Sequence, residues 1–229
     1  MNYIYWKGKD SRDISGLMIC ELPPITKPKM RVKTETIDGR DGSIITELGY
    51  EAYDKTISIG LTKGFDIDEV IDYFSGEGML HMSNEPDKYY RGNIIDQIDY
   101  ERLVRFRTAK VKINVQPFKY SATERMKTIT PTGDSMEVRN NGNTTAKPLI
   151  GLYGSGTINL YLNGSQVCVI DLSDGYIALD CENMEAFRGE ELKNRKMIGN
   201  FPVLKIGKNS FTWTGTITKA EFVRFSRWI

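Results

Sequence analysis

The sequence contains very little histidine and cysteine, and neither residue type forms a recognisable catalytic or metal-binding motif. Only one of the 229 residues is histidine, and three are cysteine. A Ser-His-Asp or Cys-His mechanism would have to use His81, but no nucleophile motif lies beside it, so we expect a structural histidine. Cys20, Cys168 and Cys181 form no CxxC pair, which indicates buried, reduced thiols. We therefore expect no metal ion.

The sequence also lacks an excess of charge of either sign. It has 31 Lys and Arg against 30 Asp and Glu, which gives a formal net charge of +1. Coating a nucleic acid requires a basic excess that neutralises phosphates, and attachment to an anionic membrane surface requires a polybasic segment. The composition therefore predicts neither a nucleic acid nor a membrane as a specific partner.

Long hydrophobic runs are missing as well. No apolar stretch approaches the roughly 18 residues that a membrane span requires. The first residues, MNYIYWKGKDSRD, lack the basic-then-apolar order of a signal peptide. We expect a soluble protein that is synthesised in a cytoplasm.

Two residue types could in principle act on sugars. Paired carboxylates hydrolyse glycosidic bonds when they face each other across a cleft, but clustering in a sequence does not show that placement, so solvated charge is the better interpretation. Trp213 could stack on a sugar ring, although a tryptophan in a strand more often lies in a core or an interface. No Gly-rich phosphate loop is present, and we predict no catalytic or cofactor-binding residues. The carboxylates in question are Glu182, Glu185, Glu190 and Glu191.

Residues 89–121 form the longest stretch in which apolar and polar residues alternate with the period of a half-buried strand. The phase of the alternation changes near Thr108: Val104 and Phe106 are the expected buried pair before it, and Val111 and its odd-numbered neighbours are the buried set after it. Such a change is typical of a β-bulge. We predict strands over 89–98 and 103–118, joined through the polar residues 96–102, and the second is a long, bent central strand that Pro117 ends, because proline removes a backbone donor.

One helix is predicted over residues 66–75. Asp66 can accept the first amide protons, and Glu69 can complete a capping-box pair. A buried stripe is expected on one side of this helix, because apolar residues recur at helical spacing. The stripe consists of Ile67, Val70, Ile71 and Phe74. Gly76 is the expected left-handed cap.

The segment 38–53 is long and polar for a connection between two strands. It follows a strand expected to be half-buried near residues 30–37, and it contains two Asp-Gly pairs that favour tight turns. Connections beyond about 12 residues are usually functional or mobile. We predict a projecting arm in which Asp38, Arg40 and Asp41 contact another subunit, with a mobile surface loop as the alternative.

The remaining pattern predicts a mainly β protein with two domains. Residues 1–120 form a β-rich domain with one α-helix, and a Ser-, Thr-, Asn- and Gly-rich stretch follows. Residues 121–229 contain short strands separated by turn signals, including a hairpin at Asn163-Gly164 and another at 207–209, and these features favour a β-sandwich.

Three stretches resemble the distal tail protein (Dit) family of long-tailed bacteriophages. They are FDIDEVIDYFSGEGMLHMSNEPDKYYRGNII at 65–95, VKINVQPFKYS at 111–121 and NFPVLKIGKNSFTWTG at 200–215. Their order and spacing fit nearly the whole chain. The resemblance implies a virion protein of the tail tip, made in the bacterial host. Its N-terminal domain would build a hexameric ring around a DNA channel, and its C-terminal domain would be a galectin-like sandwich that docks neighbouring proteins.

The implied partners are the tail tube protein and the tail-tip or baseplate proteins, and no catalytic residues are implied. Galactose recognition uses a His-Asn-Arg set with a stacking Trp, and no histidine follows His81. A carbohydrate-binding module that recognises host cell-wall glycans is the second hypothesis. A glycan hydrolase that uses buried carboxylates is the third.

Overall fold

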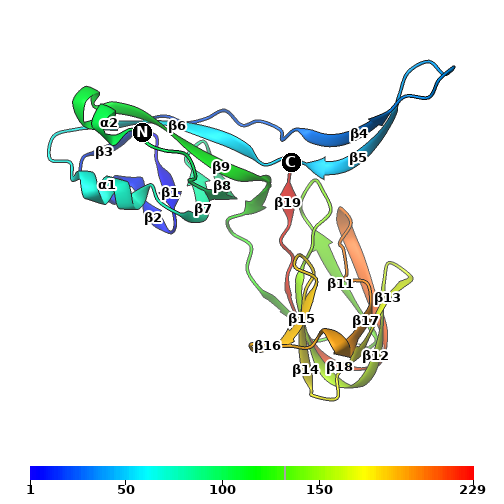
Figure 1. The fold of residues 1–229 in the computed structure, drawn as a ribbon. Coiled ribbons are helices and arrows are strands. Elements are labelled where there is room, and N and C mark those ends of the chain that lie inside the picture. Colours follow the sequence, from blue (N-terminus) through cyan, green and yellow to red (C-terminus); the bar gives the residue numbers. More distant parts are fainter. Residues whose placement is uncertain (132) are drawn as a thin grey trace. The chain divides into compact units, whose positions relative to one another are not determined.

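The computed structural model describes residues 1–131 and 133–229, and its contacts divide the chain into two compact units. The N-terminal unit is Met1–Ala122 with Ile229, and the C-terminal unit is Thr123–Trp228. Each has a hydrophobic core of its own. Both consist mainly of β-strands (Figure 1), which confirms the predicted fold class. The ring-forming and docking roles assigned to the two domains stay predictions.

The main sheet of the N-terminal unit has the strand order β2–β1–β7–β8–β9–β6–β3, and all its neighbours are antiparallel. Strands β4 and β5 form a separate two-stranded sheet. The bounds are β1 Ile4–Trp6, β2 Lys9–Asp10, η1 Ser11–Asp13, β3 Leu17–Glu21, β4 Met30–Glu35, β5 Ile44–Tyr50, β6 Tyr53–Leu61, α1 Ile67–Tyr73, β7 Glu77–Met82, β8 Glu85–Asn93, α2 Tyr100–Phe106 and β9 Thr108–Ser121.

Helix α1 begins and packs largely as its sequence predicts. The Asp66 carboxylate accepts from the backbone N–H groups of Asp68 and Glu69, at 3.0 and 3.4 Å. Val70 and Phe74 are buried. The expected capping box is incomplete, because Glu69 turns away to Lys9 (Oε1–Nζ 3.0 Å) and to the backbone N–H of Ser15.

The predicted stripe of α1 is wrong at Ile71, which is 39% exposed. Tyr73 takes the inward position instead, and its hydroxyl donates to the carbonyl oxygen of Ile4 at 3.2 Å. The helix ends earlier than predicted, and Gly76 has the predicted positive φ, 68°. The buried face of α1 is therefore rotated slightly about the helix axis relative to the stripe that the spacing predicts.

The strand predicted over 103–118 is wrong in its first part, because helix α2 occupies Tyr100–Phe106, whereas the strand predicted over 89–98 corresponds to the end of β8. The N-cap of α2 is Asp99, whose carboxylate accepts from the Arg102 N–H at 2.8 Å, and Arg107 ends the helix with φ 61°. The change of phase near Thr108 thus marks the end of a helix and the start of β9. Val104 and Phe106 are exposed, at 39% and 60%, and Leu103 is the buried residue of α2. No helix in the described part of the chain is long and apolar enough to cross a membrane.

Pro117 lies inside β9 and does not end it. The pairing of β8 with β9 shifts between Tyr90, which faces Lys119, and Gly92, which faces Val115. The three residues 116–118 therefore oppose a single residue of β8. A proline fits there because residues in a bulge need not donate to the ladder. The bulge predicted near Thr108 is wrong, because β9 pairs with β6 without a shift from Thr108 to Val115, and the irregularity at residues 116–118 is a different one.

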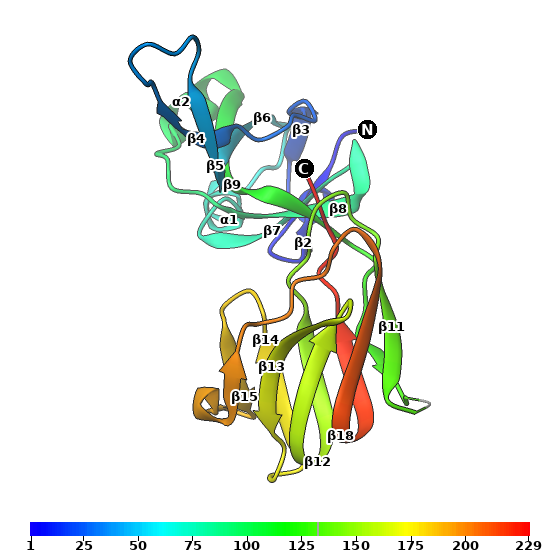
Figure 2. The same ribbon diagram turned by 90° about the vertical axis from the view of Figure 1, so that its right-hand side faces the viewer.

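The C-terminal unit is a sandwich in which both layers share the same long strands. The pairing of β12 with β18 is irregular between Tyr153 and Asn159, so each strand contributes its two halves to different layers. The first half of β12 pairs with β14, and its second half pairs with β13 (Figure 2). The bounds are β10 Lys127–Ile129, β11 Ser135–Asn140, β12 Leu149–Leu162, β13 Ser165–Asp171, β14 Tyr176–Asp180, β15 Glu185–Arg188, β16 Glu191–Leu192, η2 Asn194–Lys196, β17 Met197–Gly199, β18 Gly207–Val223 and β19 Arg227–Trp228.

Of the two hairpins predicted in this unit, one is confirmed and one is wrong. Asn163 and Gly164 both have positive φ, 53° and 84°, and they join β12 to β13 with Leu162 opposite Ser165. This is the two-residue turn whose twist matches that of paired strands. Residues 207–209 instead begin β18, and Lys208 pairs with Arg139 of β11. A Gly-Lys-Asn sequence starts this strand and makes no turn within it.

Candidate functional site

The only histidine lies among aromatic rings. The His81 ring centroid is 6.3 Å from that of Tyr5 and 5.4 Å from that of Tyr89. Burial lowers the pKa of the imidazole below its ordinary value, because desolvation disfavours the charged form. Among the described residues, no serine or cysteine side chain hydrogen-bonds to it. This environment fits a packing role.

The three cysteines differ in exposure. Cys168 and Cys181 are buried in the C-terminal core as predicted, and burial raises the pKa of Cys168 to about 12. Cys20 is exposed, which contradicts the prediction of a buried thiol. It is one of the last residues of the edge strand β3, where the alternating pattern turns it outward. Among the described residues, no cluster of three or more His, Cys, Asp or Glu side chains could hold a metal ion.

The residues that could serve a sugar-active protein are not placed for that chemistry. Trp213 is only 4% exposed and belongs to the sandwich core, so its ring face cannot stack on a sugar. Three of the four carboxylates are exposed, and the carboxylate of Glu191 lies 2.5 Å from the Lys193 ammonium. Glu182 is half-buried. These positions agree with solvated charge.

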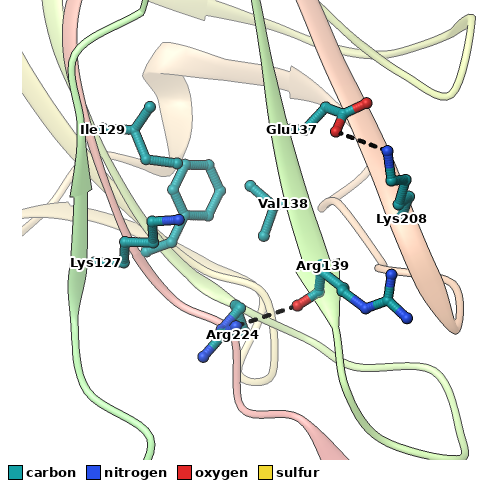
Figure 3. Close-up of a pocket in the computed structure, with 8 residues that line it drawn as sticks. Lys127, Ile129, Glu137, Val138, Arg139, Lys208 and Arg224 are labelled. Atoms are coloured by element: carbon teal, nitrogen blue, oxygen red, sulfur yellow. Dashed lines mark hydrogen bonds and ion pairs between the residues drawn. The ribbon is translucent and has the colours of Figure 1, made fainter.

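A small cleft in the C-terminal unit lies beside β10 and β11. Its volume is about 190 Å³. Glu137 pairs with Lys208 at 3.3 Å, and Arg224 donates to the carbonyl oxygen of Arg139 at 3.4 Å; Figure 3 marks both interactions with dashed lines. The other lining residues are Lys127, Ile129, Val138 and Phe222. Ligand pockets usually have volumes of about 300–1,000 Å³, so we assign no glycan site here.

We therefore predict that the protein does not bind simple galactosides. Isothermal titration calorimetry with lactose should give no binding heat, because Trp213 is buried and no histidine is available in the C-terminal unit. A galactoside-binding lectin measured under the same conditions serves as the control. Millimolar or tighter binding would contradict the prediction and favour the carbohydrate-binding hypothesis.

Strands β4 and β5 form an arm, here defined as residues 30–50, that pairs with no other strand in the described part of the chain. Figure 1 shows them as a separate two-stranded ribbon that ends in a turn. The predicted arm thus exists, but it is a hairpin: β4 is exposed and not half-buried, and Ile44–Tyr50 is a strand and not a loop. A lone two-stranded hairpin is at best marginally stable in water, so the arm needs a surface to cover it.

The register of the arm gives it one apolar and one polar face. Directly paired residues share a face, so Val32 lies beside Glu47, and Thr34 beside Ile45. The apolar face consists of Met30, Val32, Thr34, Ile45, Glu47 and Tyr50. The polar face consists of Arg31, Lys33, Glu35, Ile44, Thr46 and Gly49, and it contains the ion pair of Lys33 with Glu35. Val32 is 44% exposed and Ile45 is 62% exposed, so the N-terminal unit leaves the apolar face open to solvent.

The three residues predicted to contact another subunit lie in the turn of the arm. Gly39 and Gly42 have φ values of 78° and 81°, as the two Asp-Gly pairs predict. Asp38, Arg40 and Asp41 are exposed. The turn thus presents charge at the end of the arm, while the apolar side chains that need burial lie along its strands. The contact of these three residues with a subunit stays a prediction.

The whole chain has counterparts among solved structures. It matches the crystal structure of the SPP1 Dit (gp 19.1) protein with a TM-score of 0.68 and 18% identity, over 97% of this chain and 98% of that one. The chain has the Dit fold. It also matches chains of the phage P2 baseplate in its activated conformation, with Ca and with Sr, each at a TM-score of 0.50 and 9% identity. Those matches cover 97% of this chain and 97% and 96% of the baseplate chains. No family model and no curated protein matches the sequence.

In this version of the Dit fold the base of the arm is fixed by contacts with the main sheet. The backbone N–H of Glu51 donates to the carbonyl oxygen of Lys29 at 2.9 Å, and the Tyr50 ring meets the edge of Phe118 with centroids 5.8 Å apart. The Tyr53 hydroxyl donates to the carbonyl oxygen of Thr26 at 3.4 Å. The first of these bonds joins the two ends of the hairpin to each other, and the other two contacts link them to β9 and β6 of the main sheet.

A buried charge cluster lies under the segment that enters the arm. Lys55 is 1% exposed, and its ammonium donates to the carbonyl oxygen of Pro24 at 3.1 Å. Its charge lies 4.8 Å from the Tyr90 ring centroid. Glu85 accepts from Lys119 at 2.7 Å and from the Tyr90 hydroxyl at 3.1 Å. Burial lowers the pKa of Lys55 to about 8, although Glu85 counteracts this.

Sequence reasoning missed the apolar face of the arm in this Dit fold. The signal is the run Ile44, Ile45 and Thr46, whose β-branched residues favour a strand. The sequence predicted only the turn, since the Asp-Gly pairs are strong local signals. It also missed Lys55, because a lysine in an alternating strand is ordinarily taken to point to solvent.

Proposed function

We propose that this protein is a structural component of a phage tail tip that forms a hexameric hub ring. The observation that carries the proposal is the likeness to SPP1 Dit over both units of the chain, at nearly full length of both proteins. That protein is described as a paradigm of the hub adsorption apparatus in phages that infect Gram-positive bacteria. The matching P2 chains come from a baseplate, which is a tail assembly as well.

In this proposal the ring joins the tail tube to the baseplate or tail-tip proteins and leaves a channel for DNA. It is assembled in the virion after synthesis in the bacterial host, and it has no catalytic activity. The formal net charge of +1 suits a channel, because a strongly basic lumen would hold passing DNA by its phosphates. Binding of specific nucleic-acid sequences forms no part of this function.

A closed ring requires a head-to-tail interface that joins two different surfaces of the same chain. The apolar face of the arm supports this requirement, since its aliphatic side chains are exposed in the single chain. The predicted turn residues Asp38, Arg40 and Asp41 would contribute ion pairs at the rim, where exposed pairs are worth only about 0–1 kcal/mol. The strands of the arm would therefore supply most of the interface energy.

Native mass spectrometry of the purified protein tests the ring. The expected particle has six times the chain mass of 26.1 kDa, or a multiple of that. A stable dimer or trimer would contradict the hub. A monomer at high micromolar concentration would show that the chain does not form a ring by itself.

The role of the arm is tested by shortening it. Deletion of residues 38–49 would remove most of β5 and leave β4 without most of its partner strand. We therefore prefer a variant in which the dipeptide Asn-Gly replaces the residues between Val32 and Glu47, which already pair with each other. The expected result is a lower oligomer order with unchanged circular dichroism. The matched control replaces Asp38, Arg40 and Asp41 by alanine and keeps the strands, and it should lower the oligomer order less. An unchanged particle mass after shortening would contradict the role of the arm.

A further inference from the structure

The segment that enters the arm has no strand partner of its own. Residues 22–29, here called the strap, connect β3 to β4, run alongside β6 (Figure 1) and form neither helix nor strand. The strap contains Pro23, Pro24 and Pro28, and a proline has no backbone N–H to donate to a ladder. In the described part of the chain, no backbone–backbone hydrogen bond holds residues 22–28. The main sheet must therefore hold the strap in another way.

Side chains of the main sheet hold the strap by its carbonyl oxygens. The donors are Lys55 and Tyr53 of β6 and Asn84, which lies between β7 and β8, and each of them bonds to a different strap residue. The bonds are those of Asn84 to Pro23 at 3.1 Å, Lys55 to Pro24 at 3.1 Å and Tyr53 to Thr26 at 3.4 Å. Because no ladder is involved, the strap can detach from the sheet without unpairing any strand.

The strap also shields a buried cation from water. Lys55 is 1% exposed, and among the described residues the only hydrogen bond of its ammonium is the one to Pro24. The neighbouring carboxylate of Glu85 is already bonded to Lys119 and to the Tyr90 hydroxyl. A buried charge with few partners is costly, and its return to water is favourable. Detachment of the strap therefore regains the hydration of Lys55, which lowers the free energy of opening.

We propose that the strap is a latch for the arm, which opens as a unit and lets the arm change direction while the main sheet stays paired. The closed latch ties the first strand of the arm to β6. When it is open, the second strand alone ties the arm to the main sheet, at Tyr50, Glu51 and Ala52, and these residues become the hinge. Segments that move are the least stable parts of a structure, and the strap has few bonds. The latch is a property of a single chain and does not depend on the ring proposed above.

Acetylation of Lys55 measures the opening of the latch in the full-length protein. The closed strap keeps the amine from N-hydroxysuccinimidyl acetate, and the open strap exposes it. Peptide mass spectrometry gives the rate of acetylation at urea concentrations below the unfolding transition. We expect a rate that hardly depends on urea, because opening of a short segment exposes little surface. A Lys55 that reacts only when the whole N-terminal unit unfolds would overturn the latch.

Removal of one strap bond should make the opening more frequent. Asn84→Ala removes the donor to Pro23, and Tyr53→Phe removes the hydroxyl that donates to Thr26 but keeps the ring. Each variant is expected to raise the acetylation rate of Lys55 about 2- to 10-fold, which is the effect of losing one ordinary hydrogen bond. Rates equal to that of the parent in both variants would overturn the proposal, since these bonds would then not hold the strap.

The matched control is Asn114→Ala, which removes a side-chain amide of the same kind. Asn114 of β9 donates to Asp54 of β6 at 2.8 Å, next to Lys55 in the sequence, and it makes no bond to the strap. The control should leave the acetylation rate of Lys55 unchanged. An acceleration equal to that of Asn84→Ala would overturn the latch, since it would indicate a general loosening of β6.

Hydrogen exchange of the Glu51 amide shows whether the arm moves with the strap. This N–H donates to the carbonyl oxygen of Lys29, the last residue of the strap, at 2.9 Å. In the Asn84→Ala protein its exchange should accelerate by the same factor as the acetylation of Lys55. Faster acetylation without faster exchange at Glu51 would overturn the latch, since the strap would then open while the base of the arm stays closed.

Discussion

Replacing Phe74 by alanine is expected to lower the free energy of unfolding of the N-terminal unit by about 3–5 kcal/mol, because it removes a fully packed ring from a core that relaxes only partly. Phe74 is 2% exposed and meets Tyr73 edge-on with ring centroids 4.9 Å apart. Val70, which is fully buried, should cost about 2 kcal/mol or more when it is replaced by alanine. Urea unfolding followed by circular dichroism measures both values.

The control for this prediction lies on the same helix. Ile71 is 39% exposed, and Ile71→Ala should cost about 1 kcal/mol or less, as substitutions away from the core usually do. If the Phe74→Ala protein unfolds at the same denaturant concentration as the parent, the side chain does not pack as the structure shows. Equal losses at Phe74 and Ile71 would mean that helix propensity, and not burial, determines the effect.

A second large effect is expected from Lys55 as the pH rises. Its pKa is about 8 in the folded protein against an ordinary value of 10.5. Below pH 8 the side chain is protonated in both states and the folded protein bears the full cost of a buried charge, whereas above pH 10.5 it is neutral in both. The free energy of unfolding should therefore gain up to about 3 kcal/mol from Lys55 between these two pH values.

This gain is measured as a difference between the parent and Lys55→Met, which keeps the length of the side chain and removes its charge. Burial also raises the pKa of Tyr73 and of Tyr90, so deprotonation of these phenols opposes folding at high pH in both proteins. That effect cancels in the difference. The stability of the parent relative to the variant should rise from pH 8 to pH 10.5. Parallel pH profiles would show that Lys55 is not desolvated.

The elements that the sequence predicted correctly depend on local rules. The N-cap of α1 and the Asn163-Gly164 turn need only a few neighbouring residues, because a carboxylate accepts nearby amide protons and Asn-Gly adopts positive φ. The turn of the arm was predictable for the same reason. Such features leave a clear mark in a short stretch of sequence.

The elements that it missed depend on contacts between distant residues. Alternation at Val104 and Phe106 fits a strand as well as a seven-residue helix, and only the burial of Leu103 decides between them. Pro117 is accommodated by a bulge opposite β8, which the proline alone does not reveal. The site is limited in the same way, since a pattern of exposed aliphatic residues on the arm shows that a partner is needed without naming it.

The shared strands of the C-terminal unit bear on how it opens under native conditions. Hydrogen exchange usually exposes separate cooperative segments, each with its own opening free energy. Here β12 and β18 each run through both layers. Within these two strands, one layer passes into the other where the pairing is irregular, between Tyr153 and Asn159. Loss of one layer therefore removes the pairing partners of the other. We therefore expect the protected amides of the two layers to exchange as one opening unit, because the same two strands link both layers.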